Sequence, residues 1–281
     1  MIIPRGGIAD LAAVAAHYDD LDELYRSIWG SDIHHGYWIT GSESSEEAVL
    51  NLTRLVARQA SIRPGDRVCD IGCGYGAVAL TLNREYGAQI TGLTVSEKQY
   101  QRANAAAAGN NQVNFLLCDA LSNDLGANSF DVAIAVESSE HMPDKLAFLR
   151  EVNRLLRSGG RCVVAAWLAR ERPGAWESKY LLEPICAEGR LPNMASPTEF
   201  RGMLESAGFD DVSFLDLTLS VRKTWSLCAR RVTKRIFTDP TFRRILTDPH
   251  FTNRVFAKTV FRIWLAYQIG SMRYGCFSAR K

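Results

Sequence analysis

The sequence predicts an α/β fold whose mainly parallel sheet is covered by helices on both faces. In the middle of the chain, short β-type runs alternate with segments of helical periodicity, which is typical of repeated strand–helix units. The β-type runs are continuously apolar, as expected of strands buried on both sides. The length of 281 residues suits one doubly wound domain with an added cap, and a composition of 47% hydrophobic and 23% charged residues excludes a disordered chain.

Six strands and four helices account for the central part of the chain. The predicted strands, in chain order, are Arg67–Ile71, Gln89–Leu93, Val113–Cys118, Asp131–Val136, Arg161–Trp167 and Asp211–Leu217. The predicted helices between them are Gly76–Tyr86, Glu97–Ala108, Asp144–Arg157 and Thr198–Ala207. Ser96 suits the N-cap of the second helix, and Ser158-Gly159-Gly160 is expected to end the third.

Two further segments lie outside this alternation. The N-terminal part shows apolar residues at helical spacing and then the aromatic run Ile33–Trp38. In the segment 221–270, the strings Thr238–Phe242 and Thr247–Phe251 both place Pro after a Thr-Asp pair, which indicates two helix starts. Met272–Ala279 is then predicted to be a last strand. We therefore expect a helical lid at residues 1–60, a core at 61–220, a helical cap at 221–270 and the last strand of the sheet at 271–281.

The cysteines and the apolar stretches indicate in which cellular compartment the protein is expected. Seven cysteines are scattered along the chain without a CxxC pair or zinc spacing, which favours a reducing compartment and no structural metal. The N-terminus has no apolar core of signal-peptide length, and the run Val255–Ile269 is too short to span a membrane. We expect a cytoplasmic protein without an integral membrane segment.

The string Val68–Gly76 stands where the first predicted strand turns into the first predicted helix. Glycines at such a turn let the backbone approach a nucleotide-like ligand, although Gly72 and Gly74 with Ala77 also fit a dinucleotide fingerprint. Asp70 separates the two interpretations, because its carboxylate would repel a pyrophosphate and attract a cation. No acid ends the second strand to bind a dinucleotide ribose. The string therefore favours S-adenosylmethionine, which has an ammonium and a sulfonium group, over a tight turn without a ligand.

At these residues the sequence resembles the class I S-adenosylmethionine-dependent methyltransferases, and among them the γ-tocopherol C-methyltransferase group of small-molecule methyltransferases. The strings that carry the resemblance are Ile33–Trp38, Asp70–Gly76, Gly92–Ser96 with Gln99, and Glu137–Lys145. They lie within roughly residues 15–220, and the Glu137–Lys145 run is the most specific. The resemblance implies a Rossmann-like, doubly wound sheet of seven strands, with the N-terminal lid and the C-terminal cap attached to it.

The resemblance also implies a set of cofactor contacts at the strand ends and in the lid. The implied cofactor-binding residues are Asp70, Gly72, Cys73, Gly74, Thr94, Gln99, Asp119, Ala120, Glu137, Tyr18, Tyr37 and Trp38. Asp70 would lie beneath the ammonium, and Thr94 with Gln99 would hold the ribose, although most of the class has an acid where Thr94 stands. The three aromatic residues would close over the sulfonium as part of the lid, unless they belong to a satellite core.

His141 is the preferred general base, since it follows the fourth strand at the edge of the sheet where such sites form. Glu140, together with Glu137, is expected to orient or polarise it. The alternative is a histidine that only satisfies local hydrogen bonds, because methylation of an alkene or amine needs no base. His34 and His35 are weaker candidates that would position the lid.

The cap is aromatic and basic, which bears on the methyl acceptor. Its aromatic residues are Trp225, Phe237, Phe242, Phe251, Phe256, Phe261, Trp264 and Tyr267. An apolar pocket favours a hydrophobic small molecule, and we expect C-methylation of an aromatic or prenylated natural product, with N- or O-methylation of an alkaloid or phenol as the alternative. Arg254, Lys258 and Arg262 recur on one helix side, where they would hold an anionic group or face the solvent.

The charge is divided unevenly between the two parts of the chain. Residues 217–281 contain 14 Lys or Arg and 2 Asp or Glu, whereas residues 1–216 contain 19 and 29. A basic segment would suit nucleic acid, but the run Glu137–Glu140 lacks the Asn/Asp-Pro-Pro-aromatic string of base-amino methyltransferases, so we expect no nucleic-acid partner. Cyclopropanation of lipid chains stays open because of Thr94, although His35 stands where those synthases have Cys. The intact glycine loop disfavours a non-catalytic binding module, and a homo-oligomer stays open.

Overall fold

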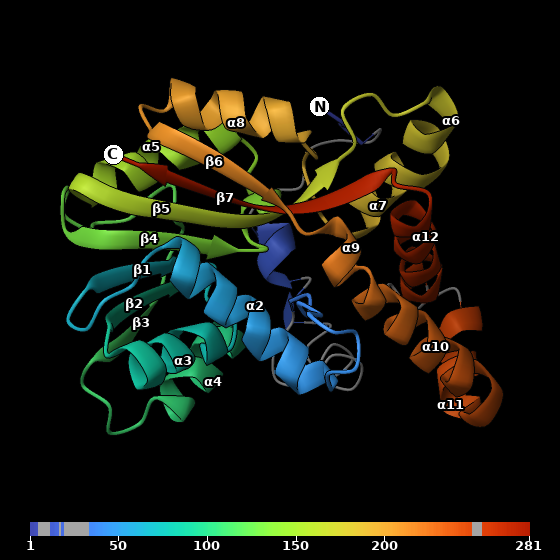
Figure 1. Cartoon of the computed structure of the whole chain (residues 1–281). Helices are drawn as coiled ribbons and strands as arrows, with labels where there is room; N and C mark the ends of the chain where they lie inside the picture. Colours follow the sequence, from blue (N-terminus) through green and yellow to red (C-terminus); the bar gives the residue numbers. More distant parts are fainter. Residues whose placement is uncertain (5–11, 17, 20–33, 249–254) are drawn as a thin grey trace.

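A computed structural model describes residues 1–4, 12–16, 18, 19, 34–248 and 255–281. Its centre is a seven-stranded sheet with the order β3-β2-β1-β4-β5-β7-β6 (Figure 1). The strands are β1 Arg67–Ile71, β2 Gln89–Thr94, β3 Val113–Leu117, β4 Phe130–Val136, β5 Leu156–Ala169, β6 Asp210–Asp216 and β7 Met272–Arg280. The first five strands pair in parallel, and β7 runs antiparallel between β5 and β6. The predicted α/β class, the seven strands and the last strand after the cap are confirmed.

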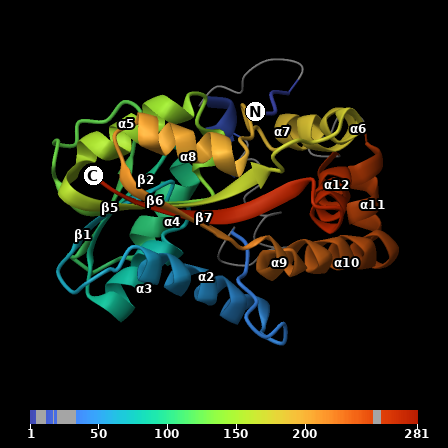
Figure 2. The ribbon, with the colours of Figure 1, turned by 45° about the horizontal axis from the view of Figure 1, so that its top comes forward.

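The helices lie on both faces of the sheet and at one end of it (Figures 1 and 2). Those that cover the sheet are α2 Ser45–Gln59, α3 Ala77–Tyr86, α4 Glu97–Ala106, α5 Lys145–Leu155 and α8 Pro197–Ser206. A 3₁₀ turn, η1 Ser139–His141, follows β4; α6 Ala175–Glu177, the π turn η2 Ser178–Leu182 and α7 Glu183–Glu188 follow β5. The cap consists of α9 Thr218–Val221, α10 Lys223–Thr238, α11 Pro240–Thr247 and α12 Phe256–Gln268.

Alternate residues of the central strands enter two different cores. On β1, Val68 packs in the core that α2 and α3 cover, whereas Cys69 and Ile71 pack in the core that α5 and α8 cover. Phe148 of α5 is fully buried in this second core. Since both faces of each strand are buried, the strands read as continuous apolar runs, which is the pattern that predicted the fold.

The junction between α5 and β5 differs from the prediction. The helix ends at Leu155, and β5 begins at the next residue rather than after the predicted stop at Ser158-Gly159-Gly160. The pairing of β4 with β5 shifts register between Phe130 and Val132. Phe130 pairs with Leu156 and Val132 with Arg161, so β5 has extra residues at this bulge. Gly159 has a φ of +72°, which this irregular part of the strand requires and few other residues adopt.

The cap begins its third helix as the sequence predicts. Asp239 accepts a hydrogen bond from Phe242 N at 3.0 Å, and Pro240 occupies the first position of α11. The second Thr-Asp-Pro string, Thr247–Phe251, extends beyond the described residues. Buried residues of α10 and α12 share one core with Tyr274 of β7, so the cap packs directly on the sheet. Among the described helices, none is long and apolar enough to cross a membrane.

Candidate functional site

A cavity opens at the carboxyl ends of β1 to β4, on both sides of the point where the strand order reverses. In open α/β sheets this is the usual place for a ligand. The predicted site residues that line it are Tyr18, Asp70, Gly72, Cys73, Gly74, Thr94, Gln99, Asp119, Ala120, Glu137 and His141. The sequence therefore located most of the site, because each strand end places its following residues at the same edge of the sheet.

The glycine loop brings bare backbone to this cavity. Gly72 has a φ of +78°, and a Cβ there would lie 2.2 Å from the Cβ of Ser138. Gly74 has a φ of +54°, and a Cβ there would meet no atom within 4 Å, because it would point into open space. The amides of Gly72 and Cys73 both donate to the carbonyl of Leu93 at 2.9 Å, which fixes the loop against β2.

Asp70 is a buried carboxyl group, and one of its oxygens is unsatisfied by the part of the chain that the structure describes. It is 2% exposed, and its Oδ2 atom has no hydrogen-bond partner among the described residues. Burial raises its pKa to about 7. A buried oxygen of this kind is costly unless a donor satisfies it, and a cationic ammonium fits both its charge and its place on the cavity.

Thr94 and Gln99 are joined to one another on the cavity wall. The Thr94 hydroxyl donates to Gln99 Oε1 at 2.8 Å, and Ser96 N donates to the Thr94 hydroxyl at 3.2 Å. Ser96 also caps α4, as predicted, by accepting from Gln99 N at 3.1 Å. These bonds fix the orientation of the Gln99 amide beside the cavity.

The lid approaches the cavity through its helical residues 12–16, 18 and 19. Val14 and Tyr18 line the cavity. Asp19 is held by the Ser96 hydroxyl at 2.5 Å and, through its carbonyl, by Lys98 Nζ at 2.6 Å. This part of the N-terminal segment therefore docks on the loop after β2. Residues 20–33 of the predicted lid lie outside the described residues.

Tyr37 and Trp38 differ from the expectation for the lid, because neither lines the cavity. The amide of Tyr37 donates to Ala48 O of α2 at 2.7 Å. Trp38 is buried, its Nε1 lies 3.4 Å from the Thr224 hydroxyl, and Lys223 Nζ stands 4.1 Å from the centre of its ring. These two residues join α2 to the cap, and among the described lid residues the aromatic one that lines the cavity is Tyr18.

His141 ends the 3₁₀ turn η1 and presents a neutral ring to the cavity. Its Nδ1 lies 3.3 Å from the carbonyl of Arg190, which only accepts, so Nδ1 carries the proton. Its Nε2 lies 2.8 Å from the Tyr18 hydroxyl, which is therefore the donor of that bond. Burial lowers the pKa of His141 to about 4, the nearby Lys145 cation adds to this, and the Arg190 carbonyl opposes it.

Glu140 does not orient His141, contrary to the expectation. Its carboxylate accepts from Trp167 N and from the Ser139 hydroxyl, and it does not line the cavity. Burial raises the pKa of Glu140 to about 7. Glu140 and His141 are consecutive in a helical turn, so their side chains leave in different directions. The groups that hold His141 are the Tyr18 hydroxyl and the Arg190 carbonyl, which sequence reasoning did not pair with it.

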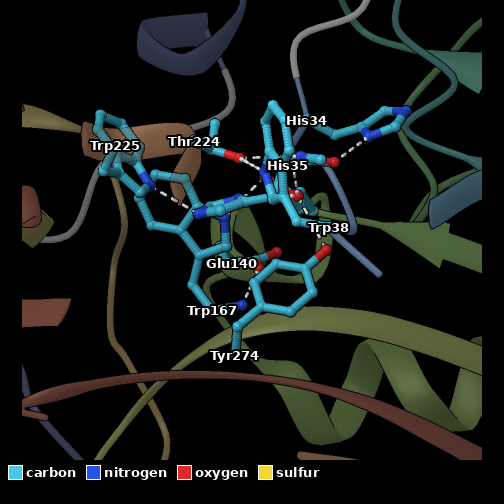
Figure 3. Close-up of polar contacts among 10 residues, drawn as sticks. His34, His35, Trp38, Glu140, Trp167, Thr224, Trp225 and Tyr274 are labelled. Atoms are coloured by element: carbon cyan, nitrogen blue, oxygen red, sulfur yellow. Dashed lines mark hydrogen bonds and ion pairs between the residues drawn. The ribbon is translucent and has the colours of Figure 1, made fainter. Parts of the chain in front are cut away.

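Glu137 is the centre of a buried cluster next to the cavity, and Figure 3 shows His35, Trp167 and Tyr274 of this cluster. Its Oε1 accepts from His35 N at 2.7 Å, from His35 Nδ1 at 3.0 Å and from the Tyr274 hydroxyl at 2.8 Å. Its Oε2 accepts from Trp167 Nε1 at 2.7 Å. Although burial raises it, the attraction and hydrogen bonds of His35 lower the pKa of Glu137 to about 2. The carboxylate is therefore ionised at neutral pH.

His35 completes this cluster and is not a lid contact with the cavity. Its Nδ1 donates to Glu137, and its Nε2 accepts from Trp225 Nε1 at 2.6 Å, so both nitrogens are satisfied. Trp167, Trp225 and Tyr274 come from β5, α10 and β7. No motif or spacing in the sequence indicates that these distant residues contact Glu137 or His35.

Asp119 and Ala120 reach the cavity from the end of β3. Asp119 Oδ1 accepts from Leu121 N at 2.8 Å, which holds the turn that follows the strand. Cys118, the preceding residue, also lines the cavity. Within the described part of the chain, no group of three or more His, Cys, Asp or Glu residues is arranged to hold a metal ion.

The aromatic residues of the cap do not form one wall. Those that are buried in the core are Trp225, Phe242 and Tyr267; those that are exposed are Phe237, Phe261 and Trp264. Arg262 pairs with Glu188, and Lys258 is exposed. Phe251, Arg254 and the side chain of Phe256 lie outside the described residues. The buried aromatic residues of the cap therefore support packing, and no described aromatic residue of the cap lines the cavity at the strand ends.

The fold, the glycine loop and the Asp70 oxygen that no described residue satisfies define an S-adenosyl-L-methionine-dependent methyltransferase. Comparison with known proteins agrees, since the model of the family described as mycolic acid cyclopropane synthetase matches residues 7–235. The chain is 35% identical over 218 residues to the 27-O-demethylrifamycin SV methyltransferase of Amycolatopsis mediterranei (strain S699), covering 76% of this chain and 79% of that protein. The chain belongs to this family of methyltransferases.

Two further comparisons are consistent with this placement. The chain is 29% identical over 257 residues to the chloroplastic tocopherol O-methyltransferase of Arabidopsis thaliana, covering 80% of this chain and 74% of that protein. The crystal structure of mycolic acid cyclopropane synthase CmaA1 complexed with SAH and CTAB superposes with a TM-score of 0.84 at 19% identity, covering 98% of this chain and 99% of that one. This last likeness concerns the fold.

Proposed function

We propose that the chain transfers a methyl group to a hydroxyl or phenol oxygen of a hydrophobic small molecule, in the biosynthesis of a natural product. The observation that carries the proposal is the pair formed by Tyr18 and His141 on the cavity wall. A neutral imidazole with a fixed tautomer is suited to accept the proton that an oxygen nucleophile must lose. The relative from Amycolatopsis mediterranei described above is named for a 27-O-demethylrifamycin, which also favours an oxygen acceptor.

The residues at the strand ends would each bind a different part of the cofactor. Asp70 would hold the ammonium, the backbone at Gly72 and Gly74 would face the amino-acid end, and Thr94 with Gln99 would hold the ribose. When bound, the sulfonium supplies an electrophilic methyl group. Val14 and Tyr18 cover the cavity from the lid, which would exclude water from the reaction.

Proton transfer would pass through Tyr18, because its hydroxyl already occupies the basic nitrogen of His141. The substrate O–H bond breaks as its proton goes to the Tyr18 oxygen, and the proton of Tyr18 goes to His141 Nε2. The substrate oxygen forms the new bond to the methyl carbon. The Arg190 carbonyl, which accepts from Nδ1, stabilises the imidazolium that results.

C-methylation of a prenyl chain is a second candidate, and Glu137 is the observation that favours it. Its carboxylate is held ionised by four hydrogen bonds and lines the same cavity. A fixed anion stabilises positive charge that develops on a carbon chain when it attacks the methyl group. Cyclopropanation would place a similar positive charge in the site.

The two candidates are separated by His141→Asn and Tyr18→Phe. For oxygen methylation, both variants lower kcat by roughly 10²–10⁴-fold, because the proton acceptor or its relay is lost. Turnover is measured with methyl-labelled cofactor and a panel of phenolic, prenyl and alkaloid acceptors, and NMR identifies the methylated atom. Cofactor affinity, measured by calorimetry, is expected to stay close to that of the parent. A product methylated at carbon, with undiminished turnover in both variants, would replace the first candidate by the second.

A further inference from the structure

His34 has a nitrogen on the cofactor cavity to which no described residue forms a hydrogen bond. The side chain is buried and lines the cavity, and its ring points away from the cluster around His35 (Figure 3). Its Nδ1 lies 2.9 Å from the carbonyl of His35, which only accepts, so Nδ1 carries the proton. Its Nε2 is buried and has no hydrogen-bond partner among the described residues. In the neutral ring, this atom therefore presents a bare lone pair.

The other charged and basic groups on the cavity indicate which part of the cofactor His34 would meet. Three carboxyl groups line it, from Asp70, Asp119 and Glu137, and the described lining contains no Lys or Arg. Its two bases are His34 and His141, and both nitrogens of His141 already have partners. The amino-acid end of S-adenosylmethionine brings one ammonium and one carboxylate. Asp70 suits the ammonium, and His34 is the remaining basic side chain of the described lining that has a nitrogen free to meet the carboxylate.

We propose that His34 binds the carboxylate of the cofactor as an imidazolium ion, so that cofactor binding takes up a proton at Nε2. A neutral Nε2 would repel a carboxylate oxygen, whereas the protonated atom donates a charge-assisted hydrogen bond. The proton comes from the buffer, and no bond of the cofactor is made or broken. The inference concerns the cofactor end of the site and holds whichever atom of the acceptor is methylated.

The charged and titratable groups around His34 bear on this protonation. Those that share the cavity with it are Tyr18, Asp70, Cys73, Tyr75, Cys118, Asp119, Glu137 and His141. On the other side, Arg231 of α10 lines a second, smaller cavity that His34 also contacts. Glu137 is ionised and favours a positive charge on His34, and such a charge would help to keep the pKa of Glu137 low. Arg231 opposes that charge.

Asp70 is expected to exchange a proton in the opposite direction when the cofactor binds. Burial raises its pKa to about 7, so part of the free enzyme carries a proton there near neutral pH. An ammonium beside Asp70 favours the ionised form, so this site releases a proton when the cofactor binds. The total proton exchange is therefore a difference between His34 and Asp70, and variants of His34 are needed to isolate its share.

Titration calorimetry with S-adenosylmethionine, at pH 7.5 in buffers of different ionisation enthalpy, measures the protons exchanged on binding. Relative to the parent, His34→Gln is expected to lower proton uptake by up to about one proton per site. Because Gln keeps an N–H donor, its affinity for the cofactor should fall less than that of His34→Leu. For His34→Leu we expect a loss of about 10–100-fold in affinity, the usual range for a charge-assisted hydrogen bond.

Decarboxylated S-adenosylmethionine is the matched ligand, since it keeps the ammonium and lacks the carboxylate. It should bind the parent and His34→Leu equally well. His141→Asn is the matched variant, and it should leave proton uptake at the parent value. Unchanged proton uptake in His34→Gln, or an equal loss of affinity for both ligands in His34→Leu, would overturn the proposal. Failure of the parent to bind S-adenosylmethionine would instead contradict the cofactor on which the proposed function depends.

Discussion

Two buried carboxyl groups stand at the ends of neighbouring strands and differ in what surrounds them. Asp70 lies near the end of β1, one of its oxygens has no partner within the described ranges of the chain, and burial raises its pKa to about 7. Glu137 follows β4, which pairs with β1, and receives four hydrogen bonds that help to lower its pKa to about 2. Among the described residues, one oxygen of Asp70 is therefore left without a donor and is available to a ligand, whereas both oxygens of Glu137 already accept hydrogen bonds within the fold.

Gly74→Leu gives the largest expected effect on the Asp70 side of this comparison. A side chain there would extend into the open cavity and would also strain the backbone, whose φ is +54°. We expect no cofactor binding that calorimetry can detect. Gly109→Leu is the matched control, because Gly109 is exposed, has a φ of +82° and also has open space around its Cβ position. Retained binding in Gly74→Leu would mean that the cavity beside Asp70 is not the cofactor site.

Glu137→Gln tests the Glu137 side of the comparison through the free energy of unfolding. The variant removes a buried charge and leaves the donors of His35, Trp167 and Tyr274 with one good acceptor fewer, so we expect a loss of about 2–4 kcal/mol in the free energy of unfolding. Tyr274→Phe removes a single donor and should cost about 1 kcal/mol. Urea unfolding measures both. An equal cost for the two variants would mean that the charge of Glu137 contributes little.

The pH dependence of the Glu137→Gln effect follows from the direction of its pKa shift. The pKa of Glu137 in the folded state lies below its ordinary value of 4.5. Its contribution to stability is therefore complete above that value and is lost as the pH falls towards 2. The difference in unfolding free energy between the parent and the variant should shrink over this range. A difference that stays constant from pH 6 to pH 3 would show that the carboxylate is not held ionised.

The sequence carries a local signal for the place of Asp70 and none for the partners of Glu137, and the reason is physical. The proposed role of Asp70 follows from a local pattern, in which a strand end and its glycines lie within a few residues of each other. The role of Glu137 depends on Trp167 and Tyr274, which reach it only after β5 and β7 pair antiparallel. The expectation that Glu140 orients His141 differs from the structure for a related reason. A 3₁₀ turn places adjacent side chains in different surroundings.

Asp70→Asn is the variant that most directly sharpens the comparison, and its effect on stability is expected to be the smallest. The pKa of Asp70 in the folded state lies above its ordinary value of 3.8, so the folded protein holds a proton that the unfolded chain releases. The stability of the parent should therefore fall as the pH rises from about 4 to about 7, and this part of the pH dependence should be absent in the variant. The variant should be at least as stable as the parent at pH 8.

Cofactor binding by Asp70→Asn should show the opposite result. The neutral amide lacks the charge that attracts an ammonium, so affinity for S-adenosylmethionine should fall about 10–100-fold, as measured by calorimetry at pH 8. Loss of affinity without loss of stability is expected only for a group whose partner is the ligand. If Asp70→Asn instead destabilises the fold as much as Glu137→Gln does, then both carboxyl groups are structural and the cavity must hold the ammonium in another way.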